Sequence, residues 1–354
     1  MVNCAIRTAL LKKWNNNGFI KIFSSIPTKL KQRLLKAWIS YFDSEKVFWF
    51  PRTVQIETTT FCNLSCPTCP QSSQTQQEHH LSVSEFREII ARLPLSIKSV
   101  VLSGVGEPLI NPNFFEIVDF LRTRNINCCF YTNGTLLTPQ TTYKILSRSN
   151  ITALSISCDS ANKKKFEVLR RGADFEQWEL YVRNFISRAR ERFSRPLEIT
   201  MFTVLGPMNV KEAEKIILFA SDMGFDRIHF FDPVPISPGN IEQRLSCATV
   251  NGIDQDRLSK VAKKLGVSVR FSLQRPEFPS NAKIRCYLPW IYTFVRTNGD
   301  ILPCYALFRS DKSPVIGNLF QSRFVDIWRG ENARTFRKAS VMGNNDFCRA
   351  CPYY

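Results

Sequence analysis

The stretch TTTFCNLSCPTCP, residues 58–70, carries three cysteines at C-x3-C-x2-C spacing: Cys62, Cys66 and Cys69. It follows the alternating run 53–57, a pattern that predicts a strand. Three thiolates so close together can hold one corner of a metal centre and leave a fourth position open. An iron–sulfur cube with three cysteine ligands keeps one iron free to bind another group. The spacing therefore predicts a cluster with an open coordination site at the end of a strand.

Length and composition limit the classes of protein to which this chain can belong. The chain has 354 residues, 44% of them hydrophobic and 22% charged, which predicts one large domain or one large and one small domain. The net charge of +18 indicates an anionic substrate, partner or surface. We find no signal-peptide pattern and no apolar run long enough to span a membrane. Together with 12 cysteines, this predicts a reducing compartment, the cytosol.

Residues 1–50 form a basic extension with nine Lys and Arg against Asp43 and Glu45. Leu30, Leu34 and Trp38 recur at helical spacing, with basic residues between them. One interpretation is a helix packed on the outside of the main domain. The other is an interfacial helix on an anionic membrane surface or an anionic substrate carrier, which would place the protein at the membrane periphery.

Strand-like and helix-like segments alternate from residue 53 to about 232. Such alternation predicts a parallel sheet, either an incomplete barrel or a doubly wound sheet, with ligands at the carboxyl ends of the strands. The predicted strands are Val54–Glu57, Ser99–Ser103, Cys128–Thr132, Ala153–Ser157, Glu198–Val204 and Arg227–Phe231. The predicted helices are 82–92, Phe114–Arg124, a segment from Thr138, 162–170, 175–192 and 210–223, with a further helix at 254–265 and strand at 267–272.

The ends of these strands carry small and polar residues. Two glycines and a carboxylate follow the second strand, and an Asn-Gly pair follows the third; both patterns also occur in ordinary turns. Short hydroxyl and carboxylate side chains alternate after the fourth strand, which suits a sugar, and a later arginine pair suits a carboxylate. These residues are Gly104, Gly106, Glu107, Asn133, Gly134, Ser155, Ser157, Asp159, Arg170 and Arg171.

Taken together, these motifs resemble the radical S-adenosylmethionine (SAM) enzymes over residues 53–232. The resemblance implies a partial (β/α)6 barrel, TIM-like, in which Cys62, Cys66 and Cys69 bind a 4Fe–4S cluster that cleaves SAM to a 5′-deoxyadenosyl radical. That radical would abstract a hydrogen atom from substrate. The implied SAM contacts are Gly104, Gly106, Glu107, Asn133, Ser157, Asp159 and Arg171.

One position departs from the family pattern. The residue before the third cysteine is often an aromatic that touches adenine, and here it is Thr68. This leaves the adenine contact to backbone or to another side chain.

A second cysteine set lies near the C-terminus: Cys286, Cys304, Cys348 and Cys351. Between the first two, Asn298-Gly299 separates alternating runs and predicts a β-hairpin. Four thiolates can hold zinc or an auxiliary 4Fe–4S cluster. The spacing resembles the SPASM or shortened "twitch" extension of radical SAM enzymes, which implies a cluster in a small α+β domain.

The remaining cysteines and histidines carry weaker predictions. Cys158 alternates away from Ser157, which predicts that it packs beneath a helix. His79 and His80 lie in a polar loop and are expected to be solvated.

These observations predict a basic extension (1–50), a radical SAM core (51–235), a bridging segment (236–280) and an auxiliary-cluster domain (281–354). The expected partners are a small-molecule or peptide substrate and an electron donor such as flavodoxin or ferredoxin, with no specific nucleic acid. One alternative is a peptide-modifying maturase. The other is a non-catalytic zinc protein that binds nucleic acid.

Overall fold

The computed structural model describes residues 47, 49–69, 79–192, 197–231, 253–273, 286, 288–307, 313–342 and 345–349. The predicted helix of the basic extension and Cys351 lie outside these residues.

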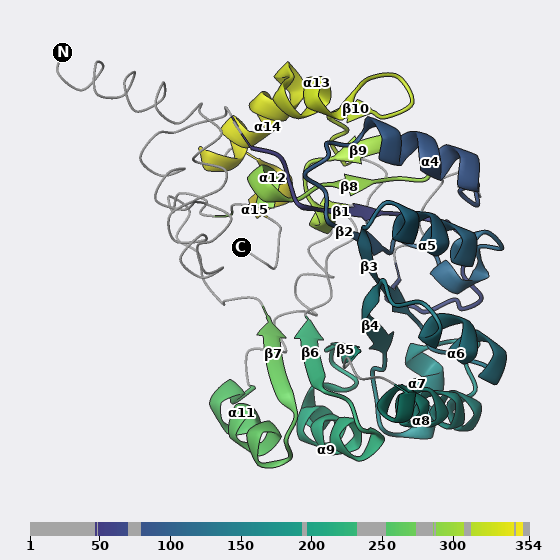
Figure 1. Cartoon of the computed structure of the whole chain (residues 1–354). Coiled ribbons are helices and arrows are strands. Elements are labelled where there is room, and N and C mark those ends of the chain that lie inside the picture. Colours follow the sequence, from purple (N-terminus) through teal and green to yellow (C-terminus); the bar gives the residue numbers. More distant parts are fainter. Residues whose placement is uncertain are drawn as a thin grey trace.

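One curved sheet organises the described chain (Figure 1). Strands β1 to β7 pair in chain order and in parallel, and β8 joins the other side of β1, also in parallel. β9 and β10 then continue the sheet in antiparallel fashion. The strands are β1 Thr53–Ile56, β2 Ser99–Leu102, β3 Asn127–Thr132, β4 Ile151–Ser157, β5 Glu198–Val204, β6 Arg227–Phe231, β7 Ser268–Ser272, β8 Phe294–Val295, β9 Asp300–Leu302 and β10 Gly317–Asn318.

Helices between the parallel strands cover one face of this sheet, so the fold is a partial TIM-like barrel (Figure 1). These helices are α4 Val83–Arg92, α5 Phe114–Thr123, α6 Pro139–Leu146, α7 Lys163–Leu169, α8 Phe175–Arg192, α9 Ala213–Met223 and α11 Gln255–Lys264. The C-terminal part adds α12 Leu288–Ile291, α13 Phe324–Arg329, α14 Glu331–Val341 and α15 Asp346–Arg349, and short 3-10 turns are η2 Pro108–Ile110, η3 Val210–Glu212 and η5 Tyr305–Leu307.

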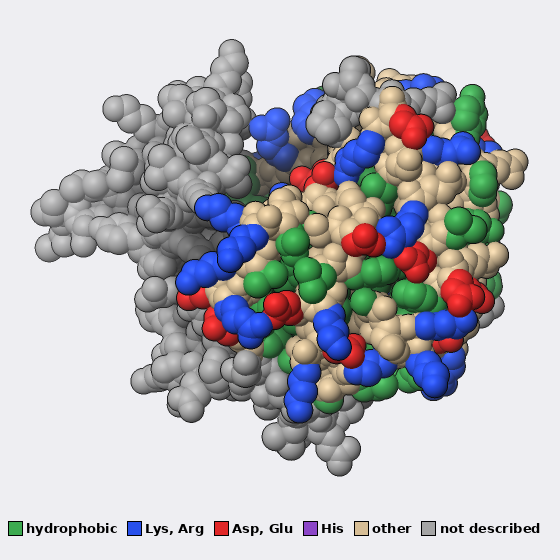
Figure 2. Space-filling model, turned by 90° about the horizontal axis from the view of Figure 1, so that it is seen from below, with side chains coloured by type: hydrophobic (Ala, Val, Ile, Leu, Met, Phe, Trp, Pro, Cys, Tyr) green, Lys and Arg blue, Asp and Glu red, His purple; other side chains and the backbone are tan. Residues whose placement is uncertain are grey.

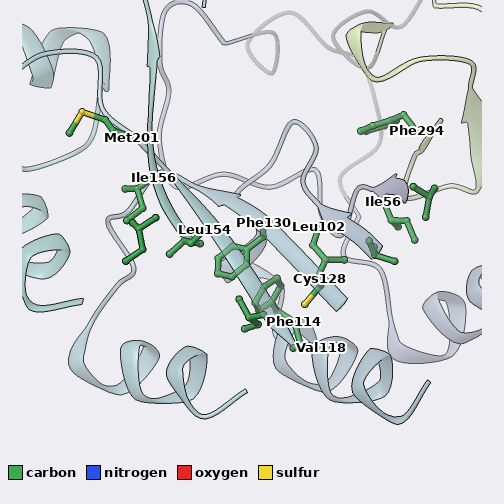
Figure 3. Close-up of a cluster of buried hydrophobic side chains, with 14 of the residues drawn as sticks. Ile56, Leu102, Phe114, Val118, Cys128, Phe130, Leu154, Ile156, Met201 and Phe294 are labelled. Carbon is green, nitrogen blue, oxygen red and sulfur yellow. The ribbon is translucent and has the colours of Figure 1, made fainter. Parts of the chain in front are cut away.

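Side-chain alternation sorts each strand into a helix-facing and a concave side. In β3, Cys128 and Phe130 are almost fully buried among the helices, with Phe114 of α5 edge-on against Phe130 at 5.0 Å (Figure 3). Tyr131 of β3 and Ser155 of β4 are only half-buried and are paired in register on the other side. The concave side therefore keeps side chains that a ligand can reach.

The local signals in the sequence are confirmed at most element ends. Ser82 and Glu85 form a reciprocal capping box at the start of α4, and Gly224 ends α9 in the left-handed conformation at φ +85°. The predicted strands match β1 to β6 within two residues. Cys158 is fully buried, as predicted.

The segment expected to bridge two units does more than connect them. It supplies α11 and β7, and β7 extends the sheet by pairing along β6 from Arg227↔Ser268 to Phe231↔Ser272. The sequence did not show this because one isolated strand pattern does not reveal its pairing partner.

Two further surface features bear on the class of protein. In the part of the chain that the structure describes, no helix is long and apolar enough to cross a membrane. The face shown in Figure 2 has Lys and Arg scattered among acidic and hydrophobic side chains, rather than gathered into one basic patch.

The hairpin predicted at Asn298-Gly299 is present as β8 and β9, and it gives a stability test. Gly299 has φ +84°, and a Cβ there would lie 2.5 Å from the ring of Phe320. Gly266 has φ +74°, and a Cβ added there would have nothing within 4 Å. We expect Gly266→Ala to cost about 1–2 kcal/mol, from backbone strain alone, and Gly299→Ala to cost clearly more. Urea unfolding of both variants measures the difference. Equal losses of unfolding free energy would show that the contact with Phe320 adds nothing to the cost of Gly299→Ala.

Candidate functional site: a three-cysteine loop at the end of β1

The three cysteines lie where the sequence predicted, directly after β1 at the carboxyl edge of the sheet. The Cys69 amide donates to the Cys66 carbonyl at 3.0 Å, which closes the loop into a tight turn. Burial raises the pKa of the Cys62 thiol to about 11, and the nearby Glu107 carboxylate and the other two thiols add to the rise. The three sulfurs are therefore close enough to influence one another.

This donor set fits an iron–sulfur cluster. Within the described ranges, no three His, Cys, Asp or Glu side chains are arranged around a single metal ion. An iron–sulfur cluster does not require three donors around one point, because each thiolate binds its own iron. Metal binding would also stabilise the thiolates against the burial that raises the pKa of Cys62 and Cys66.

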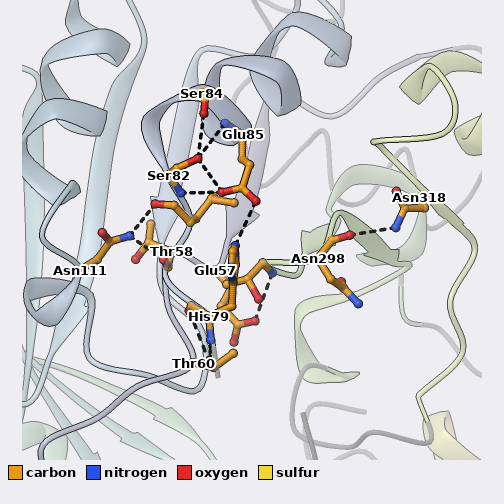
Figure 4. Close-up of polar contacts among 12 residues, drawn as sticks. Glu57, Thr58, Thr60, His79, Ser82, Ser84, Glu85, Asn111, Asn298 and Asn318 are labelled. Atoms are coloured by element: carbon orange, nitrogen blue, oxygen red, sulfur yellow. Dashed lines mark hydrogen bonds and ion pairs between the residues drawn. The ribbon is translucent and has the colours of Figure 1, made fainter. Parts of the chain in front are cut away.

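The loop is held at its start by residues just before α4 (Figure 4). The His79 amide donates to Thr60 Oγ1 at 2.8 Å, and the Leu81 amide donates to the Thr58 carbonyl at 2.9 Å. Asn111, after η2, donates to the carbonyls of both Thr58 and Leu81. These contacts fix the chain on both sides of the segment 70–78.

The two histidines are partly exposed, in line with the expectation, and each ring also has a partner in the protein. The His80 ring stacks on Phe61 at 4.4 Å and is within 2.8 Å of Thr59 Oγ1. His79 lies 3.2 Å from the Glu85 carboxylate. Both are partly exposed, and both support the residues next to Cys62.

The glycines after β2 are needed for packing against this loop. A Cβ on Gly106 would clash with the carbonyl oxygens of Thr59 and Phe61. A Cβ on Gly104 would clash with the Glu57 side chain. Only glycine lets the loop after β2 approach Glu57 and the cysteine loop this closely. The close packing of these segments therefore places both glycines at the site.

Glu57, just after β1, is a buried carboxylate that joins three segments. Oε1 accepts from the Val105 amide at 2.9 Å, and Oε2 accepts from the Thr297 amide at 3.4 Å. Burial raises its pKa, which the hydrogen bonds and Arg296 partly oppose. The sequence analysis gave Glu57 no role, and only its place at the end of a buried strand could have suggested one.

Glu107 connects the ends of β2 and β3. Its carboxylate accepts from Thr132 Oγ1 at 2.8 Å, from the Asn133 amide at 2.6 Å and from the Leu109 amide at 3.2 Å. Asn133 in turn donates from Nδ2 to Asn63 Oδ1 at 2.8 Å and lies 3.9 Å from Cys62 Sγ. The structure thus brings Glu107 and Asn133 to the cysteine loop.

The residues after β4 take different positions. Ser157 is half-buried on the concave side, whereas Asp159 is buried and forms an ion pair with Arg170 Nε at 2.7 Å. Arg171 is exposed, and its carbonyl accepts from the Ser65 amide at 2.9 Å. Of the two arginines, Arg170 is the one whose side-chain charge acts on the Cys66 thiol. Its position four residues after buried Phe166 was the available signal, because the two share a helix face.

Aromatic and polar side chains line the concave side beyond this loop. Tyr131 meets Phe202 edge-on at 5.2 Å, and Phe202 stacks on Phe231 at 4.1 Å. His229 bonds Ser272 Oγ at 2.9 Å, and burial, with nearby Arg270 and Arg227, lowers its pKa to about 3. The imidazole is therefore neutral at ordinary pH, as suits a proton acceptor or a hydrogen-bonding group.

Three of the four C-terminal cysteines lie in the described residues. Cys304 follows β9 and accepts from the Ala306 amide at 3.3 Å, and Cys348 lies 3.4 Å from Ser340 Oγ of α14. Burial raises the pKa of Cys348 to about 11, with a contribution from Cys286. Cys286 is thus close enough to Cys348 to affect its pKa, although the two are 62 positions apart in the sequence.

The Glu107 carboxylate gives a pH prediction. Burial raises its pKa from 4.5 to about 7, so its contribution to stability is greatest below about pH 4.5 and is lost as the pH rises through 7. We expect Glu107→Gln to destabilise the protein at pH 5, because one accepting oxygen is replaced by a donor. The difference in unfolding free energy between the wild type and Glu107→Gln should shrink by up to about 3 kcal/mol by pH 8, because only the wild type loses the stability linked to this carboxyl over this range. Urea unfolding from pH 5 to 8 measures it, and a pH-independent deficit would contradict the assignment.

Two family models match the parts of the chain that hold the two cysteine sets. Residues 56–220 match the model of the radical SAM superfamily, and residues 286–352 match that of the SPASM iron–sulfur cluster-binding domain. The AdoMet-dependent heme synthase of Methanosarcina barkeri is 27% identical over 312 residues, which are 81% of this chain and 84% of the relative. The mycofactocin maturase MftC of Mycolicibacterium smegmatis is 32% identical over 120 residues, 34% of this chain and 30% of the relative.

Solved structures share the fold. Streptococcus suis SuiB bound to its precursor peptide SuiA superposes with a TM-score of 0.68 at 14% identity, over 95% of this chain and 80% of that chain. The structure of anSMEcpe with bound AdoMet gives 0.60 at 17% identity, over 82% and 81%. With a three-cysteine loop at the end of β1, a partial barrel and a second cysteine set, this chain is a radical SAM enzyme with a C-terminal SPASM domain.

Proposed function

We propose that this enzyme uses SAM to abstract a hydrogen atom from a substrate held on the concave side of the barrel. The observation that carries the proposal is the position of the three thiols. They lie at the carboxyl edge of the parallel strands, next to Glu107 and Asn133. The half-buried side chains of β3 to β6 lie on the concave side below this edge. A 4Fe–4S cluster on Cys62, Cys66 and Cys69 supplies, when bound with SAM, the reductive formation of a 5′-deoxyadenosyl radical.

The protein's own part is to hold the ligand and exclude water. We propose that SAM contacts the backbone of Gly104 and Gly106, whose missing side chains face the protein, and the side chains of Glu107 and Asn133. Ser157 on the concave side suits a ribose hydroxyl. Asp159 and Arg171, predicted from the family pattern, remain candidates for the ribose and carboxylate contacts.

The substrate class is proposed from the concave side. Tyr131, Phe202 and His229 form an aromatic wall, and Ser155 and Ser272 add hydroxyls. Arg270 and Arg227 give this region a positive field at His229. A small molecule or peptide segment with a planar group and an anionic group fits this lining.

A peptide substrate is the more specific candidate. Its support is the 32% identity of one third of the chain to a maturase, and a fold shared along 95% of the chain with a peptide-bound enzyme. Transfer of deuterium from a labelled peptide into 5′-deoxyadenosine would favour a peptide over a small metabolite.

We also propose that Cys286, Cys304, Cys348 and Cys351 hold an auxiliary 4Fe–4S cluster. With four cysteine ligands it would pass electrons or stabilise the domain, without an iron open to substrate. Flavodoxin or ferredoxin would reduce the enzyme in the cytosol.

Iron analysis tests both clusters. After anaerobic reconstitution we expect roughly eight irons per chain, and about half of them after combined replacement of Cys62, Cys66 and Cys69 by Ala. The triple variant should retain the auxiliary cluster but form no 5′-deoxyadenosine from SAM under reduction.

The matched control replaces Cys128 and Cys129 of β3 and Cys158, which directly follows β4, by Ala, because these thiols belong to neither cysteine set. It should keep all the iron unless the loss of buried sulfur unfolds the chain, which circular dichroism would report. Zinc in place of iron in the wild type would contradict the proposed function.

A further inference from the structure

Arg170 lies between a buried carboxylate and a cysteine of the loop. It caps the end of α7, its Nε forms an ion pair with Asp159 Oδ2 at 2.7 Å, and its positive charge lowers the pKa of the Cys66 thiol, against a larger rise from burial. Its side chain is 13% exposed and that of Asp159 is 4% exposed. A guanidinium spreads its positive charge over one plane of three nitrogens, so the charge acts on both the carboxylate and the thiol.

The partner carboxylate is itself fixed. Asp159 Oδ1 accepts from the Val204 amide at 2.8 Å, and its carbonyl accepts from Asn209 Nδ2 at 2.7 Å. Asn209 also donates to the Val204 carbonyl at 2.8 Å. The carboxylate is therefore anchored at the end of β5, and it can orient Arg170.

The backbone around Arg170 is tied to the cysteine loop as well. The Ser65 amide, next to Cys66, donates to the Arg171 carbonyl at 2.9 Å. Gly172 has φ +99°, and a Cβ there would be 3.4 Å from Leu64. The turn after α7 thus packs directly on the segment between the first two cysteines, so the arginine keeps its place relative to Cys66.

We propose that Arg170, held by Asp159, is a positioning residue that sets the reduction potential of the cluster bound through Cys66. This inference rests on the proposed function. The potential of an iron–sulfur cluster depends on local charge and on hydrogen bonds to its sulfurs. Reduction adds a negative charge, which a guanidinium at the thiolate stabilises and a nearby carboxylate opposes.

The two partners therefore have effects of opposite sign. Arg170→Met removes the positive charge and leaves Asp159 negative, so the potential should become more negative. Asp159→Asn keeps an oxygen for the Val204 amide and removes the negative charge, so the potential should become more positive. Arg170→Lys retains the charge and should lie nearer to the wild type than Arg170→Met.

The measurement is a redox titration of the full-length, reconstituted protein without SAM, followed by the EPR signal of the reduced cluster. The auxiliary signal is identified from the variant that lacks Cys62, Cys66 and Cys69. We expect Arg170→Met to lower the equilibrium constant for reduction of this cluster at least tenfold. For a one-electron couple this is a shift of about 59 mV to a more negative potential.

Arg148→Met is the matched control. Arg148 also forms an ion pair at 2.7 Å, with Asp119, and its side chain is 16% exposed, but it belongs to the turn between α6 and β4. It should leave the potential unchanged. A shift as large as that of Arg170→Met would show that any buried arginine has this effect and would overturn the proposal.

Full iron content with an unchanged potential in Arg170→Met would overturn the inference and leave the proposed function intact. If Arg170→Met loads no cluster, Asp159→Asn decides: a positive shift supports the inference and no shift overturns it. A wild type that binds no cluster at the three cysteines would instead contradict the proposed function.

Discussion

The site depends on the burial of Glu57, a residue that is 1% exposed. Burying an ionisable group without partners is costly, so the chain must supply donors at that point. It does so with the Val105 amide from the loop after β2 and the Thr297 amide from the turn after β8. The start of the cysteine loop, the glycine loop and the C-terminal domain are thereby tied to one position.

The same position explains why the two cysteine sets belong to one sheet. β1 is central, with β2 on one side and β8 on the other, and its register fixes Ile56 opposite Leu102 and Val295. The indole of Trp49 donates to the Trp290 carbonyl, and that of Trp328 donates to the Trp49 carbonyl. These bonds connect the segment before β1 to the C-terminal helices, so the second set is placed through the strand that positions the first.

Much of the fold could be predicted because the relevant signals are local. The capping box at Ser82 and Glu85, the left-handed Gly224 and the Asn298-Gly299 turn act within a few residues, and the structure has all three. Pairing is a different matter. β7 pairs with β6 and β8 pairs with β1, at the two edges that the strands β1 to β6 leave open, and those edges exist only after the earlier strands have packed.

For the site, the sequence by itself determined the ligand chemistry. The chain length between Cys62, Cys66 and Cys69 allows the three thiols to meet, and the turn closed by the Cys69 amide and the Cys66 carbonyl brings two of them together. The strand alternation likewise determined which side chains of β4 face the concave side. The tertiary structure alone decided which charges meet those thiols. Arg170 and Arg171 are adjacent and chemically identical, yet the helix end turns the first toward Asp159 and Cys66 and leaves the second exposed. Neither residue lies within α7, which ends at Leu169, so the direction of each side chain depends on how the turn after α7 packs on the cysteine loop.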